Sequence, residues 1–345
     1  MQTVRSTWME QEIPLVLQRA TQRMGAALQR CAQDDPSPLD ATFRDIVLVA
    51  GIDWQAWQAW QELLMRAYGA CGGCIQARDG QRYLEISLAA FALSLCALEI
   101  LDDVVDGDPP ASGRQAPNVA LALLGTSVEL LGQLPLPLAH ALQGYWGVMY
   151  RRCAAAQARD VAATIDARRT VEQALAVARG SGLVTQWAVE VGGLLAAASP
   201  GLLEPLAAFG RHLGTAEKLL HDLHDIWPSD RPSDGLRRPD CNLALVAASS
   251  NGPLPSEDAA KQRQGLYDSG LLHYMWAHVD LYHMQAAAAL DRCALAGADT
   301  SPLQPLVGRA CDLLLPQGED AELHGSQDGL LPAINSQLFA DLGCL

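Results

Sequence analysis

The sequence predicts an all-α protein built as a single helical bundle. Half of its 345 residues are hydrophobic, yet only 4 are Phe and 7 are Tyr, and long Ala/Leu-rich stretches begin near Ala120 and Gln285. This excess of good helix formers over aromatic and β-branched residues favours helices over strands. Between Pro- and Gly-containing breaks lie apolar segments of roughly 15–30 residues, a length that suits a bundle.

The first segment, 8–33, places apolar residues at helical spacing and ends at the Pro-containing stretch 34–38. In the second, Trp54, Trp57 and Trp60 recur every third residue and indicate one buried or interface-facing side of a helix. Further helices are expected between the remaining breaks, which fall at Gly72–Gly73, Pro109–Pro110, Pro135 and Pro137, Ser199–Gly201, Pro228–Pro239 and Gly252–Pro255.

No change in composition marks a linker, so we expect one domain over residues 1–315. Residues 316–345 form a Gly/Gln/Asp-rich tail whose order the composition leaves open. The longest apolar run, Ile86–Leu98, is too short to span a bilayer and is followed by Glu99. We therefore expect a buried core helix there and no stable membrane insertion.

The charge and the cysteines limit the partners and the compartment. With 24 basic and 39 acidic residues the net charge is −15, and the basic residues are scattered, which argues against a nucleic-acid partner. Nine cysteines without a signal-peptide pattern indicate reduced thiols and a cytoplasmic protein. Cys71 and Cys74 form a single CxxC pair, too little for a zinc site of ordinary spacing.

The first chemically informative group closes the segment Leu98–Asp108. Asp102 and Asp106 are four residues apart, so on a helix both carboxylates project from one face. Two like charges at the negative end of a helix dipole destabilise it unless a hard cation lies between them. A solvated acidic helix end has the same pattern, so this motif alone leaves both interpretations open.

A second group, His221, Asp222 and Asp225, follows the long helical segment Phe209–Trp227. The intervening chain is long enough for antiparallel helices to bring the two groups face to face. Mg²⁺ keeps much of its water and bridges carboxylates to phosphate oxygens, so facing acidic groups predict a Mg²⁺ site for a diphosphate. Such a site would also let so acidic a chain hold an anionic substrate.

With these motifs the sequence resembles the trans-isoprenyl diphosphate synthase (polyprenyl synthetase) superfamily and its terpene-cyclase relatives. The resemblance covers about residues 60–290 and consists of several ordered motifs. The matching positions are Asp102, Asp103 and Asp106 for the first DDxxD motif, Gln157 and Asp160 for GQxxD, Phe209, Gly210, Leu213 and Gly214 for FGxxLG, and His221, Asp222 and Asp225 for the second aspartate motif.

The resemblance implies a bundle of the isoprenoid synthase type with a central apolar cavity, and a homodimer with its interface on 114–132 or 139–158. It implies an allylic prenyl diphosphate (C10–C20) as substrate and Mg²⁺ as cofactor, three ions with the bound diphosphate. The implied site residues are Asp102, Asp103, Asp106, Asp222 and Asp225 for catalysis, with Asp102, Asp106, Asp222 and Asp225 as metal ligands, and Gln157, Asp160, Lys218, Arg114, Leu98 and Trp187 for substrate binding.

The chain departs from the elongating members at three basic segments that bind the second substrate, isopentenyl diphosphate. The segment Ala56–Gln61 has no base where those members have Gly-Lys-Arg, and only Arg114 follows the first motif where they have two arginines. Gly180 and Ser181 replace a Lys-Thr pair, with Arg179 the nearest cation. We expect the allylic site to be retained and the isopentenyl diphosphate site to be lost.

The second aspartate motif is also altered. His221 replaces the first Asp, and His is a poorer Mg²⁺ ligand than an oxygen donor. Lys218, one turn before Asp222, either contacts diphosphate or forms a helix ion pair, and the sequence does not decide between them. His224 is interpreted as a structural histidine.

Ionisation of an allylic diphosphate releases pyrophosphate and leaves a carbocation that needs a dry, apolar cavity. Aromatic side chains such as Trp187, Tyr145 or Trp146 could steady this cation, although a plain core role is the simpler interpretation. The expected cavity walls come from helix faces bearing Phe91, Leu95, Leu98, Val184, Trp187 and Val191.

The missing basic segments favour a cyclase-like enzyme, in which the cation cyclises or eliminates to a terpene. The alternative is a prenyltransferase, acting either on a peptide or other acceptor or as a chain-elongating polyprenyl diphosphate synthase. A non-catalytic subunit would have no use for clustered carboxylates that destabilise their own helix.

Overall fold

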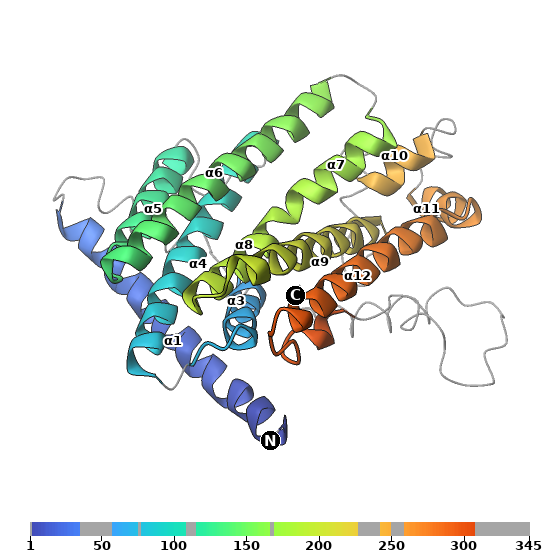
Figure 1. The fold of residues 1–345 in the computed structure, drawn as a ribbon. Coiled ribbons are helices and arrows are strands. Elements are labelled where there is room, and N and C mark those ends of the chain that lie inside the picture. Colours follow the sequence, from blue (N-terminus) through green and yellow to red (C-terminus); the bar gives the residue numbers. More distant parts are fainter. Residues whose placement is uncertain are drawn as a thin grey trace. The chain divides into compact units, whose positions relative to one another are not determined.

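The structure is a computed structural model that describes residues 2–34, 57–74, 77–107, 115–165, 169–226, 242–249 and 259–307. Within these ranges all regular secondary structure is helical, which confirms the predicted fold class (Figure 1). The elements are α1 (Gln2–Asp34), α3 (Gln58–Ala70), α4 (Arg78–Asp106), α5 (Ala116–Leu131), α6 (Leu136–Ile165), α7 (Val171–Ser181), α8 (Leu183–Leu195), α9 (Pro200–Ile226), α10 (Leu243–Ser249), α11 (Ala259–Asp268), α12 (Leu271–Leu295) and the 3₁₀ turn η4 (Gln304–Leu306).

The chain divides into two compact units. Unit 1 comprises Met1–Arg151, Ala188–Leu203 and Gly297–Pro302, and unit 2 comprises Arg152–Trp187, Glu204–Ala296 and Leu303–Leu345. The interpretation of residues 1–315 as one domain stays a prediction, and the tail 316–345 lies outside the described residues.

Helix α4 is the core of unit 1. Every side chain from Leu84 to Ala97 is buried, and α1 and α5 pack against it. By length and composition α4 could cross a membrane, but 83% of its apolar window is buried inside the protein. The helix is therefore a core helix, as the sequence analysis expected.

A buried polar network joins α4, α5 and α6 inside this core. Ser94 Oγ accepts a hydrogen bond from Trp146 Nε1 at 3.0 Å and lies 2.9 Å from the hydroxyl of Tyr150. The same hydroxyl lies 2.6 Å from Ser127 Oγ. Because buried hydroxyl and indole groups must be paired, this network fixes the register of three helices. Trp146 therefore packs in the core of unit 1, and a role for it beside the substrate cation stays a prediction.

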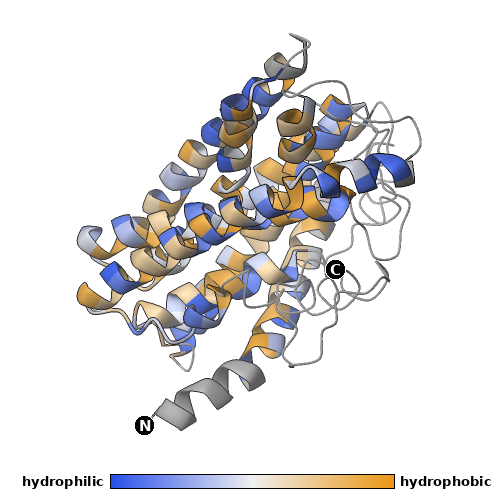
Figure 2. Ribbon diagram, turned by 90° about the vertical axis from the view of Figure 1, so that its right-hand side faces the viewer, coloured by the Kyte–Doolittle hydropathy of each residue, from blue (hydrophilic) through white to orange (hydrophobic). Residues whose placement is uncertain are grey.

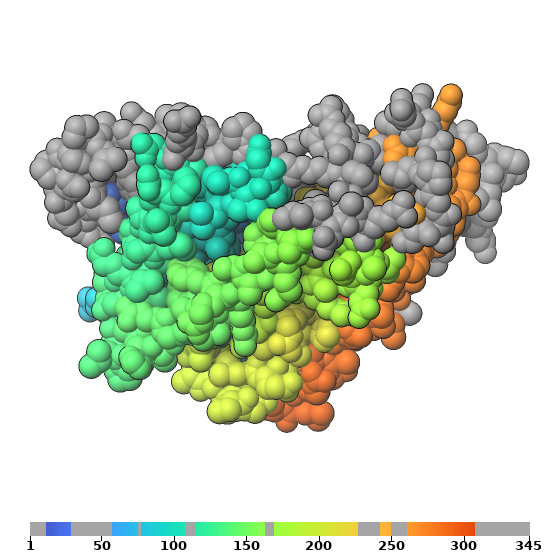
Figure 3. All heavy atoms as spheres, turned by 90° about the horizontal axis from the view of Figure 1, so that it is seen from above, coloured from blue at the N-terminus to red at the C-terminus, as the bar shows by residue number. Residues whose placement is uncertain are grey.

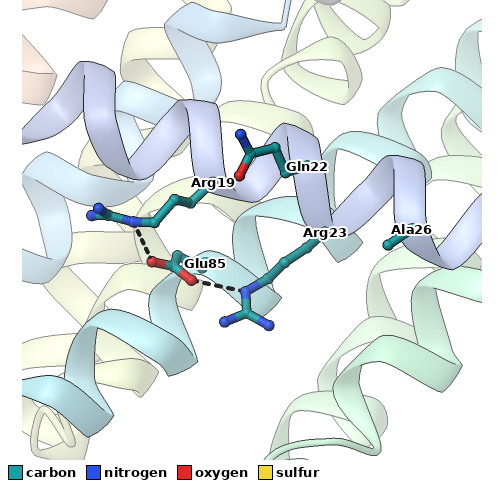
Figure 4. Close-up of a pocket in the computed structure, with 5 residues that line it drawn as sticks. All are labelled: Arg19, Gln22, Arg23, Ala26 and Glu85. Atoms are coloured by element: carbon teal, nitrogen blue, oxygen red, sulfur yellow. Dashed lines mark hydrogen bonds and ion pairs between the residues drawn. The ribbon is translucent and has the colours of Figure 1, made fainter.

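Helix α1 is attached to α4 through Glu85, which is 4% exposed. One of its carboxylate oxygens accepts from Arg19 Nε at 2.6 Å and the other from Arg23 Nε at 2.8 Å, beside a cavity of about 270 Å³ (Figure 4). Two cations around one buried carboxylate offset its desolvation. The ion pairs therefore orient α1 on the core of unit 1.

The tryptophan stripe is only partly described. Trp60 belongs to α3 and Trp57 directly precedes it, with ring centroids 5.7 Å apart, whereas Trp54 lies outside the described residues. Both rings are half-buried. This agrees with a packing role for the stripe.

Helix α5 belongs to the segments proposed as a dimer interface. Its Leu121 is 65% exposed. The teal-green atoms of α5 are visible at the surface in Figure 3. Exposed apolar side chains of this kind suit a protein interface but also occur singly on monomers. The homodimer therefore stays a prediction.

Unit 2 has its own core between α7, α9, α10, α11 and α12. Helices of the protein in general show hydrophobic and hydrophilic residues interleaved along their length (Figure 2), as amphipathic helices do. The apolar faces of the unit 2 helices meet at buried side chains that include Leu219, Ile226, Leu245, Met275 and Val279. This core holds the second half of α9, which carries the second acidic group.

Candidate active site

The first acidic group forms the last turn of α4, where the sequence placed a helix end. Asp102 and Asp106 are exposed and Asp103 is half-buried. The helix stops at Gly107, whose φ of 75° lies in the left-handed region that glycine adopts without strain. The buried stretch of α4 therefore delivers two carboxylates, one turn apart, to the surface of unit 1.

The second acidic group lies near the end of α9 in unit 2. Asp222 is buried, Asp225 is half-buried and His221 is exposed. One ligand atom from each of the three lies within 4.8 Å of the others. His221 Nδ1 is 3.3 Å from Asp225 Oδ2. The group is thus compact enough to share one cation.

Lys218 forms the helix ion pair that was one of its two expected roles. Its Nζ lies 2.8 Å from Asp222 Oδ1. Burial alone would lower the pKa of Lys218, but the charges of Asp222, Asp225 and Asp160 raise it above its ordinary value. Lys218 therefore stays charged, and three carboxylates surround its ammonium group.

Asp222 is also the N-terminal anchor of α10. Its Oδ2 accepts the N–H of Leu243 at 3.1 Å, and its backbone carbonyl accepts from the Asn242 side chain at 2.6 Å. An acidic side chain at a helix start satisfies an otherwise unpaired N–H group. Both carboxylate oxygens of Asp222 are therefore engaged, and Asp225 is the more accessible metal ligand.

Asp160, near the end of α6, is held by a residue that the sequence analysis did not single out. Nη2 of Arg169 donates to Asp160 Oδ1 at 2.5 Å and to the backbone carbonyl of Asp160 at 2.9 Å. The Arg169 side chain is 1% exposed. Arg169 stands just before α7, so only the folded chain, which brings the ends of α6 and α7 together, reveals this pair.

The other residues predicted for the site differ in exposure. Gln157 is half-buried on α6 in unit 2, and Arg114 lies outside the described residues. Arg179 is exposed and donates from Nε to the hydroxyl of Tyr282 at 2.9 Å. The expected cavity walls are buried at Phe91, Leu95, Trp187 and Val191 and half-buried at Leu98 and Val184.

A close approach between the start of α8 and α9 explains Gly214 of the FGxxLG motif. A Cβ at Gly214 would lie 2.5 Å from Thr185 Oγ1, so any larger residue would push the two helices apart. This approach places Thr185 over α9, where its hydroxyl donates to Glu217 Oε2 at 3.0 Å. Burial raises the pKa of Glu217 to about 7, and the hydrogen bond from Thr185 opposes that shift.

Glu217 gives a test of this geometry through the pH dependence of stability. A carboxyl whose folded pKa is raised stabilises the fold below its unfolded pKa of 4.5, and this contribution is lost as pH rises through about 7. As the pH rises from 5 to 8, the wild type should therefore lose on the order of 3 kcal/mol of stability that the Glu217→Gln variant does not lose. Denaturant titration of both proteins at both pH values measures it. Parallel pH profiles would contradict the buried position of Glu217.

The donor sets fit Mg²⁺ in part. Asp102 and Asp106 offer carboxylate oxygens one turn apart on an exposed helix end, and Asp225 offers another beside His221. Oxygen donors are what Mg²⁺ prefers, and an imidazole is not. Asp102 belongs to unit 1 and Asp222 to unit 2, so their expected position across one cavity stays a prediction.

No protein-family model and no curated protein sequence matches this chain. Solved structures do. The polyprenyl synthetase from Streptomyces coelicolor A3(2) has a TM-score of 0.64 at 20% identity, covering 82% of this chain and 98% of that one. The geranylgeranyl pyrophosphate synthase from Corynebacterium glutamicum, solved with isoprenyl diphosphate and magnesium, has a TM-score of 0.67 at 15% identity, covering 86% and 98%.

The farnesyl diphosphate synthase of T. brucei agrees, with a TM-score of 0.68 at 12% identity over 85% of this chain and 97% of that one. The fold is that of the isoprenoid diphosphate synthases. This confirms the fold that the sequence motifs implied. At these sequence identities a shared fold does not establish a shared reaction, so the chemistry has to be argued from the residues above.

Proposed function

We propose that this chain is an enzyme that uses Mg²⁺ to ionise an allylic prenyl diphosphate and transfers the prenyl group to an acceptor. The observation that supports it most is the pair of acidic groups at the ends of α4 and α9 on an isoprenoid diphosphate synthase fold. The comparisons with solved structures thus favour the prenyltransferase alternative over the cyclase that the missing basic segments suggested.

In this proposal Asp102 and Asp106 hold metal ions from α4, with Asp103 beside them, and Asp225 with Asp222 holds an ion from α9. Bound Mg²⁺ supplies charge neutralisation for the departing diphosphate. Lys218 is kept charged by its carboxylate neighbours and adds a cation at the same place. On α6, the Gln157 amide donates to the diphosphate, and Asp160, which can only accept, contributes by holding Arg169.

Cyclisation remains the second candidate, because a specific observation favours it. The described part of the first basic segment, 57–61, contains no cation, and Gly180 and Ser181 end α7 without one. Arg179, the nearest substitute, is exposed and bonded to Tyr282. An allylic cation without a well-bound co-substrate would rearrange or lose a proton instead of being extended.

One assay separates the two candidates. Purified protein is incubated with Mg²⁺ and C10, C15 or C20 allylic diphosphates, with and without isopentenyl diphosphate, and hydrocarbons and diphosphates are both analysed. We expect a longer prenyl diphosphate only when isopentenyl diphosphate is present. The concentration of isopentenyl diphosphate that gives half the maximal rate should be roughly tenfold or more above that of the allylic substrate, because charge-assisted contacts are lost. Hydrocarbons from the allylic substrate alone would establish the cyclase instead, and no pyrophosphate from any substrate would refute both.

A further inference from the structure

Arg169 is the most fully buried cation of the candidate site, and its hydrogen-bonding capacity is only partly used. Its Nη2 is bonded to Asp160, whereas Nε and Nη1 are buried without a hydrogen-bond partner. Buried guanidinium nitrogens without acceptors are unfavourable, since the desolvation of each charged donor is not repaid. An arrangement of this kind is stable when an anionic acceptor joins it.

Asp160 fixes the place of Arg169 and leaves the rest of its guanidinium available. A carboxylate that holds one edge of a guanidinium reduces the side-chain entropy still to be lost on binding a ligand. Arg169 also stands directly before α7, an eleven-residue helix capped by Thr170 and Gln173, whose dipole is positive at this end. The position therefore favours an anion on two independent grounds.

The neighbouring charges connect Arg169 to the acidic group of α9. Asp160, its ion-pair partner, is one of the three carboxylates whose charge raises the pKa of Lys218, and Lys218 is paired with Asp222. Two ion pairs, Arg169 with Asp160 and Lys218 with Asp222, thus lie near one another in unit 2. Within each pair the two charges cancel, but Arg169 keeps two nitrogens that can donate.

Other cations considered for a diphosphate site are less suited. Arg179 is exposed and uses Nε on Tyr282, and Lys218 is engaged by Asp222. Resting on the proposed function, we propose that Arg169 binds the diphosphate group of a prenyl diphosphate, donating from Nε and Nη1 to its oxygens. The same chemistry fits an allylic diphosphate or isopentenyl diphosphate, and the experiment distinguishes these two sources.

The test uses inorganic pyrophosphate binding by calorimetry, first in EDTA and then with Mg²⁺, so that no turnover is required. Arg169→Lys keeps a cation for Asp160 but replaces the planar fork of Nε and Nη1 with a single ammonium nitrogen, and Arg169→Gln removes the charge. Arg211→Gln is the matched control, an exposed arginine of the same unit. We expect pyrophosphate to bind roughly 10- to 100-fold more weakly to both Arg169 variants, for the loss of one or two charge-assisted hydrogen bonds, and unchanged to the control.

Thermal unfolding identifies any variant that has not folded. If Arg169→Gln does not fold, Arg169→Lys decides, and the Nε–H NMR signal of Arg169 in the wild type gives a second measurement, expected to shift on addition of pyrophosphate. Wild-type affinity in a folded Arg169→Lys protein, or an Nε–H signal unmoved by saturating pyrophosphate, would overturn the assignment and leave Arg169 a structural partner of Asp160.

Steady-state kinetics then identify the source of the diphosphate. A raised KM for the allylic substrate alone places Arg169 at the allylic diphosphate, and a raised KM for isopentenyl diphosphate alone places it at the co-substrate. Unchanged KM values for both with a lower kcat would overturn a binding role. If the wild type releases no pyrophosphate from any allylic substrate, the proposed function fails. The calorimetric experiment still tests whether Arg169 binds pyrophosphate, because it requires no turnover.

Discussion

Replacing Asp102 or Asp106 with alanine should lower turnover by roughly three decades without lowering the melting temperature. The activity loss is expected because metal neutralisation of a leaving group contributes several kcal/mol to the barrier, and each 1.36 kcal/mol is a factor of ten in rate. Stability should hold or rise, since the two carboxylates lie at the negative end of α4 and repel each other.

Pyrophosphate release with and without EDTA measures the effect, and Asp79→Ala is its matched control. Asp79 is an exposed acidic residue of the same helix, in its first turn, where a negative charge stabilises the helix dipole. This variant should keep its activity and lose a few tenths of a kcal/mol of stability. Full turnover in EDTA, or in the Asp102→Ala/Asp106→Ala double variant, would refute the metal site.

The sequence predicted those features that depend on local pattern. The apolar segment before Asp102 is a buried helix that ends at Asp106, just before the expected break at Pro109–Pro110. Helical spacing and helix-stop residues act over a few positions, so they can be recognised without the fold. The ordered motifs also implied the fold, which the solved structures confirm.

The features that the sequence did not reveal depend on contacts between distant segments. Glu217 acquires its raised pKa because Gly214 lets Thr185 approach α9, and nothing near Glu217 in sequence announces that contact. The local sequence indicates only that Glu217 is buried, because it lies on an otherwise apolar helix face with Leu213 and Leu220. Arg169 meets Asp160 only because two helix ends converge. Buried polar pairs of this kind are a tertiary property.

The ion pair of Lys218 also depends on the folded chain, and the contact of Lys218 with a diphosphate stays a prediction. Spacing allowed either a helix ion pair or a diphosphate contact, and the structure has the ion pair with Asp222. Because Asp222 also anchors α10, the two aspartates of α9 have unequal structural roles. This inequality leads to a second prediction with a large effect.

Asp222→Ala should destabilise the protein by about 3 kcal/mol, whereas Asp225→Ala should cost about 1 kcal/mol or less. Removing Asp222 leaves Lys218 largely buried without its nearest anion and leaves the N–H of Leu243 without its acceptor. Asp225 is half-buried, and its contact with exposed His221 is an accessible pair of small energetic value. Both variants should lose most activity, since both aspartates belong to the proposed metal site.

Denaturant titration at neutral pH measures the stability difference, and a double variant tests its cause. Adding Lys218→Met to Asp222→Ala removes the unpaired cation, so it should recover part of the lost stability while activity stays low. Recovery of stability without recovery of turnover would separate the structural role of Asp222 from its proposed role at the metal. Equal stability of Asp222→Ala and Asp225→Ala would mean that the ion pair and the α10 anchor contribute nothing measurable, and the second acidic group would then be only a metal site.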